Sequence, residues 1–210
     1  MKILEERYPV RIWTEDMTPF EVLVSVVLSQ ATERRNNRAA FENLRKRFKI
    51  VPEVLAKAEE EDIIHCITPA GLQNVKGPRI KAISEILVEH YNGDLGNILK
   101  LPADRARVEL MSLPGVGEKT ADVILSLVAH RGTFPVDTHI KRIARRLGLV
   151  DTPDYGKIKE RFEGIIPEDK RGKAHLALIK FGRNICRARN PSCDICPIEE
   201  FCEYKGSWIA

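Results

Sequence analysis

The sequence lacks any apolar run close to the roughly 20 residues that a bilayer-spanning helix requires. Its first residues, MKILEERYPV, include acidic side chains and no apolar segment of the kind found in secretory signal peptides. We therefore expect an intracellular, cytoplasmic protein with no membrane partner. In that reducing compartment, structural disulfides between the cysteines are not expected.

Strand patterns are missing as well, because no segment alternates cleanly between apolar and polar residues. Apolar residues recur instead at spacings of three and four, which predicts helices and an all-α fold. Thr18, Pro19 and Glu21 match a capping box with proline at the first helical position, and the apolar residues that follow predict a buried central helix. Later helices are predicted to end in left-handed caps at Gly148, Gly164 and Gly182.

The size of the chain, 210 residues with 43% apolar side chains, allows one sizeable domain or two small ones. The sequence contains no low-complexity segment, long linker or repeat of fixed period. Its character changes at RGTFP, residues 131–135, which indicates a domain crossing. The formal net charge of +4 permits a polyanionic partner without requiring one.

Cysteines are few, and most of them lie in one short segment. Cys186, Cys193, Cys196 and Cys202 have the spacing C-x6-C-x2-C-x5-C, which predicts that four thiolates converge on a metal centre. Spacing alone leaves zinc and an iron–sulfur cluster as equal alternatives, since both accept four thiolates. Arg187 and Arg189, inside this loop, can bind phosphate, offset the thiolate charge or belong to a solvated basic surface.

A glycine-rich turn in LPGVGEKTADVIL, residues 113–125, leads into another predicted helix. Around Gly115, Val116 and Gly117, backbone N–H groups at a helix N-terminus form an anion site that suits a nucleic-acid phosphate. A nucleotide phosphate loop fits poorly, because the stretch lacks the Gly-Lys-Ser/Thr ending and a preceding strand.

Lys119 is unusual, because it lies in the first turn of that helix, where the helix dipole disfavours a cation. Such a position favours the neutral amine, which is a nucleophile, although a side chain that extends into solvent is an alternative interpretation. Asp137, in FPVDTHIKRI, precedes a further helix and is predicted as its N-cap. A second interpretation makes Asp137 a carboxylate that acts together with the Lys119 amine.

Taken together, LPGVGEKTA, VDTH and the cysteine spacing resemble the endonuclease III family of helix–hairpin–helix DNA glycosylases and AP lyases. The resemblance extends from TPFEVLVSVVLSQATE through GLQNVKGPRI to CEYKG, nearly the whole chain. It implies two α-helical domains with a DNA cleft between them. The central domain, residues 15–131, would contain the hairpin, and residues 1–14 plus 132–210 would hold a [4Fe–4S] cluster on the four cysteines.

The resemblance also implies a function in base excision repair, namely removal of oxidised pyrimidines from duplex DNA and strand cleavage by β-elimination. Lys119 matches the family's Schiff-base nucleophile and Asp137 its catalytic carboxylate. Gln30 and Leu72 match residues that fill the gap left by an extruded nucleotide, and the loop between Cys186 and Cys193 matches a DNA-contacting loop. The expected partner is double-stranded DNA with damaged bases or abasic sites, bound by a monomer associated with the nucleoid.

Two alternatives remain open at this point. One is a monofunctional glycosylase that removes thymine or uracil, or adenine, from mismatches, although such relatives usually lack the hairpin lysine. The other is a non-catalytic helix–hairpin–helix protein, which would not need Lys119 and Asp137 together.

Overall fold

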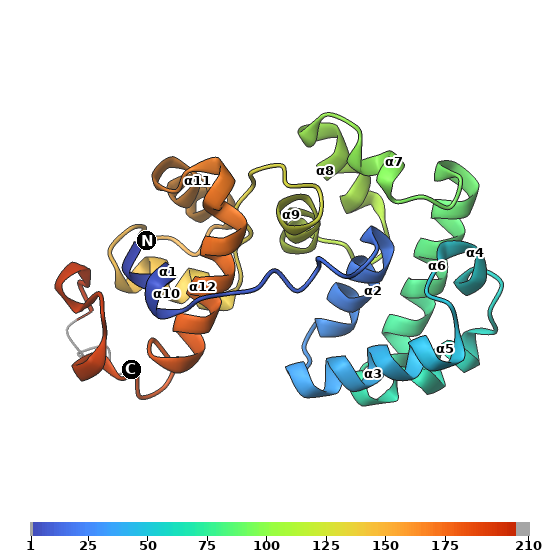
Figure 1. Cartoon of the computed structure of the whole chain (residues 1–210), viewed down its shortest axis with the longest axis horizontal. Coiled ribbons are helices and arrows are strands. Elements are labelled where there is room, and N and C mark those ends of the chain that lie inside the picture. The colour runs from blue at the N-terminus through green and yellow to red at the C-terminus, as the bar shows by residue number, and fades with distance from the viewer. Residues whose placement is uncertain (1, 205–210) are drawn as a thin grey trace. The chain divides into compact units, whose positions relative to one another are not determined.

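The computed structural model describes residues 2–204 (Figure 1). This part of the chain contains helices, turns and loops but no β-strand, which confirms the all-α prediction. The chain divides into two compact units, which we call the inserted unit, residues 14–129, and the terminal unit, residues 1–13 with 130–210. Residues 205–210 of the predicted second domain lie outside the described part.

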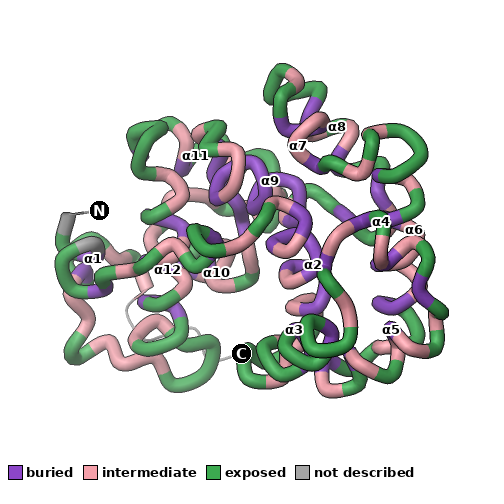
Figure 2. The backbone as a smooth tube through the Cα atoms, turned by 45° about the vertical axis from the view of Figure 1, so that its right-hand side comes forward, coloured by how far each residue is buried: buried purple, intermediate pink, exposed green. Residues whose placement is uncertain are grey.

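The inserted unit is built from α-helices with one 3-10 helix, η1. In chain order they are α2 (Pro19–Ser29), α3 (Arg34–Arg47), α4 (Pro52–Leu55), α5 (Glu60–Cys66), η1 (Thr68–Ala70), α6 (Gln73–Tyr91), α7 (Gly96–Leu99), α8 (Ala103–Ser112) and α9 (Glu118–Leu127). The short helices α4 and α5 lie along the long helix α6 (Figure 1). Helix α2 packs against α3, α6 and α9, and both α2 and α9 are largely buried (Figure 2).

The start of α2 confirms the predicted capping box. The Thr18 hydroxyl accepts a hydrogen bond from the Glu21 backbone N–H at 3.2 Å, and the Glu21 carboxylate accepts one from the Thr18 N–H at 2.8 Å. Both interactions satisfy donors that a helix N-terminus would otherwise leave unpaired. Seven of the eleven residues of α2 are buried, so α2 is the predicted central element.

The terminal unit combines the two ends of the chain. Its helices are α1 (Lys2–Arg7), α10 (Thr138–Arg146), α11 (Tyr155–Ile165), η2 (Glu168–Lys170), α12 (Arg171–Asn184), η3 (Cys193–Ile195) and η4 (Glu199–Phe201). Helix α1 packs on α12, and Tyr8 contacts the Phe181 ring at a centroid distance of 5.9 Å. Phe134 stacks on Phe162 at 4.6 Å in the core of the unit. No helix within residues 2–204 has the length and apolar character that a bilayer span needs.

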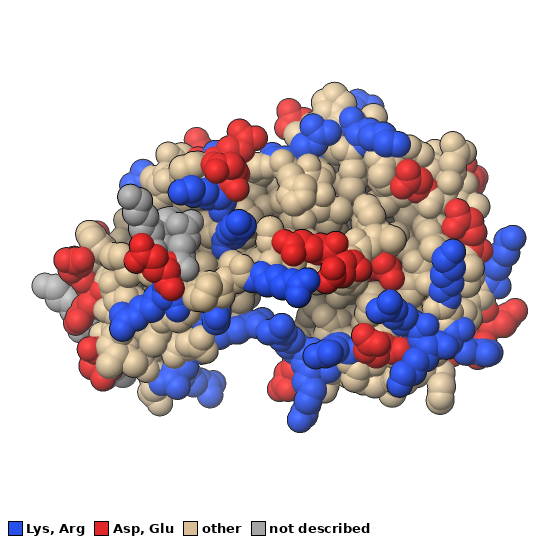
Figure 3. Space-filling model, in the orientation of Figure 1, with Lys and Arg blue, Asp and Glu red and all other residues tan. Residues whose placement is uncertain are grey.

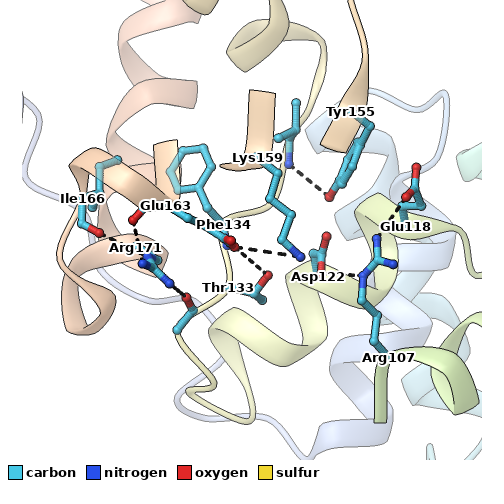
Figure 4. Close-up of polar contacts among 12 residues, drawn as sticks. Arg107, Glu118, Asp122, Thr133, Phe134, Tyr155, Lys159, Glu163, Ile166 and Arg171 are labelled. Carbon is cyan, nitrogen blue, oxygen red and sulfur yellow. Dashed lines mark hydrogen bonds and ion pairs between the residues drawn. The ribbon is translucent and has the colours of Figure 1, made fainter. Parts of the chain in front are cut away.

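A set of polar contacts, here called the clamp, fixes the irregular segment 132–136 that leads into α10 (Figure 4). The Glu163 carboxylate accepts hydrogen bonds from the Phe134 N–H at 2.8 Å and from the Thr133 hydroxyl at 3.2 Å. The Tyr155 hydroxyl accepts one from the Val136 N–H at 3.3 Å, and Arg171 donates to three backbone carbonyls around the segment. These contacts fix the backbone that leads into α10.

The glycine caps were predicted correctly at one of three positions. Gly148 has a φ of +65° after α10, in the left-handed region. Gly164 lies inside α11, which ends one residue later because Ile166 precedes Pro167 and is extended. Gly182 lies inside α12, where an added Cβ would come within 3.0 Å of the His139 Cβ. Its small size therefore permits close packing of α12 on α10.

Candidate functional site

The predicted hairpin joins α8 to α9. Leu113 and Val116 are buried and anchor the turn, and the Val116 N–H donates to the Leu113 carbonyl at 3.1 Å. Gly115 and Gly117 are exposed, and the φ of +75° at Gly115 favours glycine. The turn therefore exposes its two glycines to solvent, while the Val116 side chain packs in the core.

Arg107 ties the two helices of the hairpin to each other (Figure 4). From α8, its Nε donates to the fully buried Asp122 at 3.1 Å and its Nη2 to Glu118 at 3.1 Å, both on α9. Burial alone would lower the pKa of Arg107, but the hydrogen bonds and charges of the two carboxylates outweigh this effect and raise it. The turn geometry is thus fixed by ion pairs as well as by apolar contacts.

Lys119 is the second residue of α9 and is partly exposed. The structure therefore places it in the first turn of the hairpin helix, as predicted from the sequence. Its backbone position is set by the turn at Gly117, whose carbonyl accepts the first helical hydrogen bond, from the Ala121 N–H at 2.9 Å.

Gln30 and Leu72 lie on loops of the same unit. Gln30 is the C-cap residue of α2, and its Nε2 donates to the Gly115 carbonyl at 2.9 Å, which joins its loop to the hairpin. Leu72 directly precedes α6, has a left-handed φ of +51° and is 58% exposed. A large apolar side chain in this strained and exposed conformation is typical of a functional position.

Asp137 belongs to the terminal unit and is the N-cap of α10. Its Oδ1 accepts a hydrogen bond from the Ile140 N–H at 2.9 Å, which confirms the predicted cap. His139, two residues further on, has a pKa lowered mainly by burial. The clamp on segment 132–136 fixes the backbone that precedes Asp137. The cap hydrogen bond from the Ile140 N–H fixes the Asp137 side chain.

The four predicted metal-binding cysteines line one pocket, together with apolar residues of α10 and α12. Burial raises the pKa of the Cys193 thiol, and charge on Cys186 and Cys202 raises it further. Within residues 2–204, however, no three Cys, His, Asp or Glu side chains gather closely enough to hold a single metal ion. Four thiolates on the wall of one pocket are a donor set that either a zinc ion or an iron–sulfur cluster accepts.

Two arginines of α10 hold the cysteine loop in place. Arg146 donates to the Cys186 Sγ at 3.3 Å, to the carbonyls of Arg187 and Ala188 at 2.7 and 3.2 Å, and covers the Tyr204 ring at 4.4 Å. Arg142 donates twice to the Cys186 carbonyl, at 2.7 and 3.0 Å. Sequence reasoning did not identify them, because THIKRIARR resembles a solvated basic helix; their spacing of four, on one helix face, was the available signal.

Arg187 and Arg189 have different environments, although both are exposed. The Arg187 Nη2 donates to the Asn190 carbonyl at 2.8 Å and to the Ser192 hydroxyl at 3.2 Å, so this guanidinium stabilises its own loop. Arg189 makes no hydrogen bond or ion pair with any residue of the described part, 2–204. The face shown in Figure 3 has basic and acidic side chains interspersed. An exposed arginine is therefore not evidence of a DNA-binding surface by itself, and its position in the cysteine loop has to be considered as well.

Comparison with known proteins agrees with these observations. A family model described as HhH-GPD superfamily base excision DNA repair protein matches residues 24–168, and one for the iron–sulfur binding domain of endonuclease III matches residues 186–202. Endonuclease III of Thermotoga maritima is 38% identical over 190 residues, which cover 90% of this chain and 85% of that protein.

Solved structures show the same fold. A trapped endonuclease III–DNA covalent intermediate matches with a TM-score of 0.84 and 30% identity, over 96% of this chain and 92% of that chain. A thermostable thymine-DNA glycosylase matches with a TM-score of 0.80 over 97% and 91% of the two chains, but at 22% identity this likeness concerns the fold alone. The chain therefore belongs to the endonuclease III family within the HhH-GPD superfamily of base excision DNA repair proteins, and its cysteine loop is an iron–sulfur binding domain.

Proposed function

We propose that the protein is a bifunctional DNA glycosylase and AP lyase that excises oxidised pyrimidines from duplex DNA and cleaves the strand at the abasic site. The observation that carries this proposal is the lysine in the first turn of the hairpin helix, in a chain that resembles endonuclease III over most of its length. We further propose that it acts as a monomer on chromosomal DNA in the cytoplasm.

The Lys119 amine is the proposed nucleophile. As a neutral amine it attacks C1′ of the damaged nucleotide, the bond from C1′ to the base breaks, and the base leaves with the electron pair and takes up a proton. Opening of the sugar gives a Schiff base between Lys119 and C1′. The Schiff base acidifies the C2′–H bonds; loss of one proton and departure of the 3′ phosphate break the strand by β-elimination. Hydrolysis of the remaining Schiff base returns the amine.

Asp137 is the proposed electrostatic partner of this reaction. A carboxylate stabilises the positive charge that develops on the sugar as the base departs. The cap hydrogen bond from the Ile140 N–H keeps the carboxylate in one orientation, so little reorganisation is needed during the reaction.

Binding of damaged DNA is assigned to the loops. A base inside a duplex is out of reach of an active site, so the nucleotide must be rotated out of the stack. We propose that Gln30 and Leu72 occupy the resulting gap, while the N–H groups around Gly115, Val116 and Gly117 bind a backbone phosphate. Arg189 is the better candidate for a second phosphate contact, because Arg187 is engaged within its own loop.

The family implies a [4Fe–4S] cluster, and the residues fit it. Cys186, Cys193, Cys196 and Cys202 would each supply one thiolate from the wall of the shared pocket. When bound, the cluster supplies a covalent crosslink among four points of the loop. Arg142 and Arg146 hold the same loop by hydrogen bonds and so determine where Arg189 is presented.

Borohydride trapping on duplex DNA with one abasic site tests the proposal. We expect the wild type and the surface variant Lys57→Ala to form a covalent complex on a denaturing gel, because borohydride reduces the Schiff base. Lys119→Ala should bind the same DNA but leave no trapped product. If wild type releases an oxidised pyrimidine but is not trapped, the protein is a monofunctional glycosylase; if it binds without either reaction, it is a non-catalytic module.

A further inference from the structure

Lys76 is among the largest fully buried side chains of the described part, with 1% of its surface exposed. Buried lysines are rare, because removing an ammonium from water is unfavourable unless other groups replace the water. Lys76 lies in the first turn of α6, four residues after Leu72, and its backbone N–H donates to the Leu72 carbonyl at 2.9 Å. Neither the capping pattern nor the metal motif of the sequence accounts for it.

Each of the three N–H bonds of the Lys76 ammonium has one acceptor. Its Nζ donates to the Leu28 carbonyl at 2.9 Å, to the Thr32 hydroxyl at 2.6 Å and to the Ala70 carbonyl at 3.0 Å. Burial lowers the pKa of Lys76. The three oxygen atoms accept the hydrogen bonds that the ammonium would otherwise donate to water. A single side chain therefore joins the end of α2 and the loop after it to the end of η1, which directly precedes the loop before α6.

These two loops are also joined to each other and to the hairpin. The Thr32 hydroxyl lies 2.5 Å from the Ala70 carbonyl and 3.0 Å from the Gln30 carbonyl, and the Gln30 side chain donates to the Gly115 carbonyl. Each loop contains a non-glycine residue in the left-handed region, Ala31 in one and Leu72 in the other, both with φ of +51°. Such conformations persist only where the surroundings hold them.

We propose that Lys76 is a positioning residue that holds Gln30 and Leu72 in one rigid insertion element for duplex DNA. The proposal rests on the function proposed above, because it assigns Gln30 and Leu72 to the gap left by an extruded nucleotide. Lys76 itself touches no DNA and takes no part in the bond-breaking steps. Its contribution is to fix the two loops before DNA binds, so that insertion does not require ordering them.

This role makes the effect of Lys76 depend on the substrate. A duplex has an opposite base and a stacked gap that the insertion element must fill, whereas a single strand with an abasic site has neither. Loss of Lys76 should therefore slow cleavage of the duplex and leave cleavage of the single strand close to the wild-type rate. A general loss of folded protein would lower both rates by the same factor.

Lys81 provides a matched control on the same helix. Its Nζ also donates to two backbone carbonyls, those of Ala56 at 3.1 Å and Ala58 at 2.6 Å, but these belong to the segment between α4 and α5. Lys81→Met thus removes the same kind of contact away from the insertion loops. Thr32→Val is a milder second variant, because it removes only the hydroxyl that connects the loops to Lys76.

The experiment measures the ratio of duplex to single-strand cleavage at an abasic site for wild type, Lys76→Met, Thr32→Val and Lys81→Met. We expect the ratio to fall about tenfold or more in Lys76→Met, to fall less in Thr32→Val, and to stay within about twofold of wild type in Lys81→Met. In the Leu72→Ala background, Lys76→Met should have little further effect on the ratio, because both changes act on one element.

Equal losses on both substrates, an unchanged ratio in Lys76→Met, or the same fall in Lys81→Met would overturn the positioning role. If Lys76→Met does not fold, the ratio of Thr32→Val decides. A wild type that cleaves neither substrate would instead refute the proposed lyase function itself, so the two failures are distinguishable.

Discussion

The inserted and terminal units hold their functional loops by different means. In the inserted unit the Lys76 ammonium is fully buried and donates only to oxygen atoms of the chain itself. In the terminal unit Arg146 is partly exposed and donates to loop carbonyls and to the sulfur of Cys186. The first arrangement is complete without a cofactor, whereas the second surrounds thiols that a metal centre must join.

The two units also differ in how much apolar surface their functional segments bury. The core of the terminal unit comes mainly from α10, α11 and α12, and from the cysteine loop only Ile198 is buried in it, with Cys186 and Cys196 packed against it. The inserted unit, in contrast, buries most of α2 and α9 (Figure 2). From this comparison we predict that the loop at residues 186–204 relies on a bound cluster for its order more than the inserted unit does, because the inserted unit has extensive packing of its own.

The largest expected effect is the loss of one cysteine ligand. Cys196→Ser should abolish nearly all visible absorbance of the cluster and make residues 186–204 the first site of limited proteolysis, because the loop has little apolar burial of its own. The inserted unit should remain resistant. Cys66→Ser is the control and should retain the full absorbance. An intact, protease-resistant loop in Cys196→Ser would show that the two units do not differ as described.

The next largest effect is expected within the inserted unit, at Asp122. Asp122→Ala leaves the Arg107 Nε without its buried partner and should lower the free energy of unfolding by about 3 kcal/mol. Asp122→Asn keeps an oxygen acceptor and should cost less. Chemical denaturation followed by circular dichroism measures both values.

The matched control is the exposed pair Arg47–Asp62, which has the same 3.1 Å distance but side chains that are 61% and 46% exposed. Asp62→Ala should cost less than about 1 kcal/mol, since solvent screens the pair. If Asp122→Ala and Asp62→Ala lower the free energy of unfolding by similar amounts, burial does not make the Arg107–Asp122 pair more important for stability than the exposed pair. The cluster absorbance should stay unchanged in either variant before unfolding.

The smallest expected effect concerns Arg146. Arg146→Met removes hydrogen bonds to the loop but leaves all four cysteines, so the cluster should form and then be lost several-fold faster under mild oxidation, equivalent to about 1 kcal/mol. Arg145→Met changes an exposed neighbour in the same helical turn and should match wild type. Equal rates for the two variants would show that Arg146 does not contribute to the stability of the loop.

Local features of this fold were predictable from sequence. The capping box at Thr18 and the N-cap at Asp137 depend on residues three apart, and the cysteine spacing depends on one short loop. The partners of Lys76 were not predictable, because the Leu28 carbonyl lies 48 residues away and every residue of the chain has a carbonyl. The end of α11 was missed because Pro167, rather than Gly164, determines it.

The terminal unit contains both ends of the chain, with the inserted unit between them. During synthesis, therefore, α1 emerges well before α12, the helix on which it packs. The inserted unit can close its core while the ribosome is still producing the rest, because all of its helices come from one continuous stretch. Because Cys202 is the last of the four cysteines to be synthesised, we expect the hairpin to fold before the iron–sulfur loop is complete.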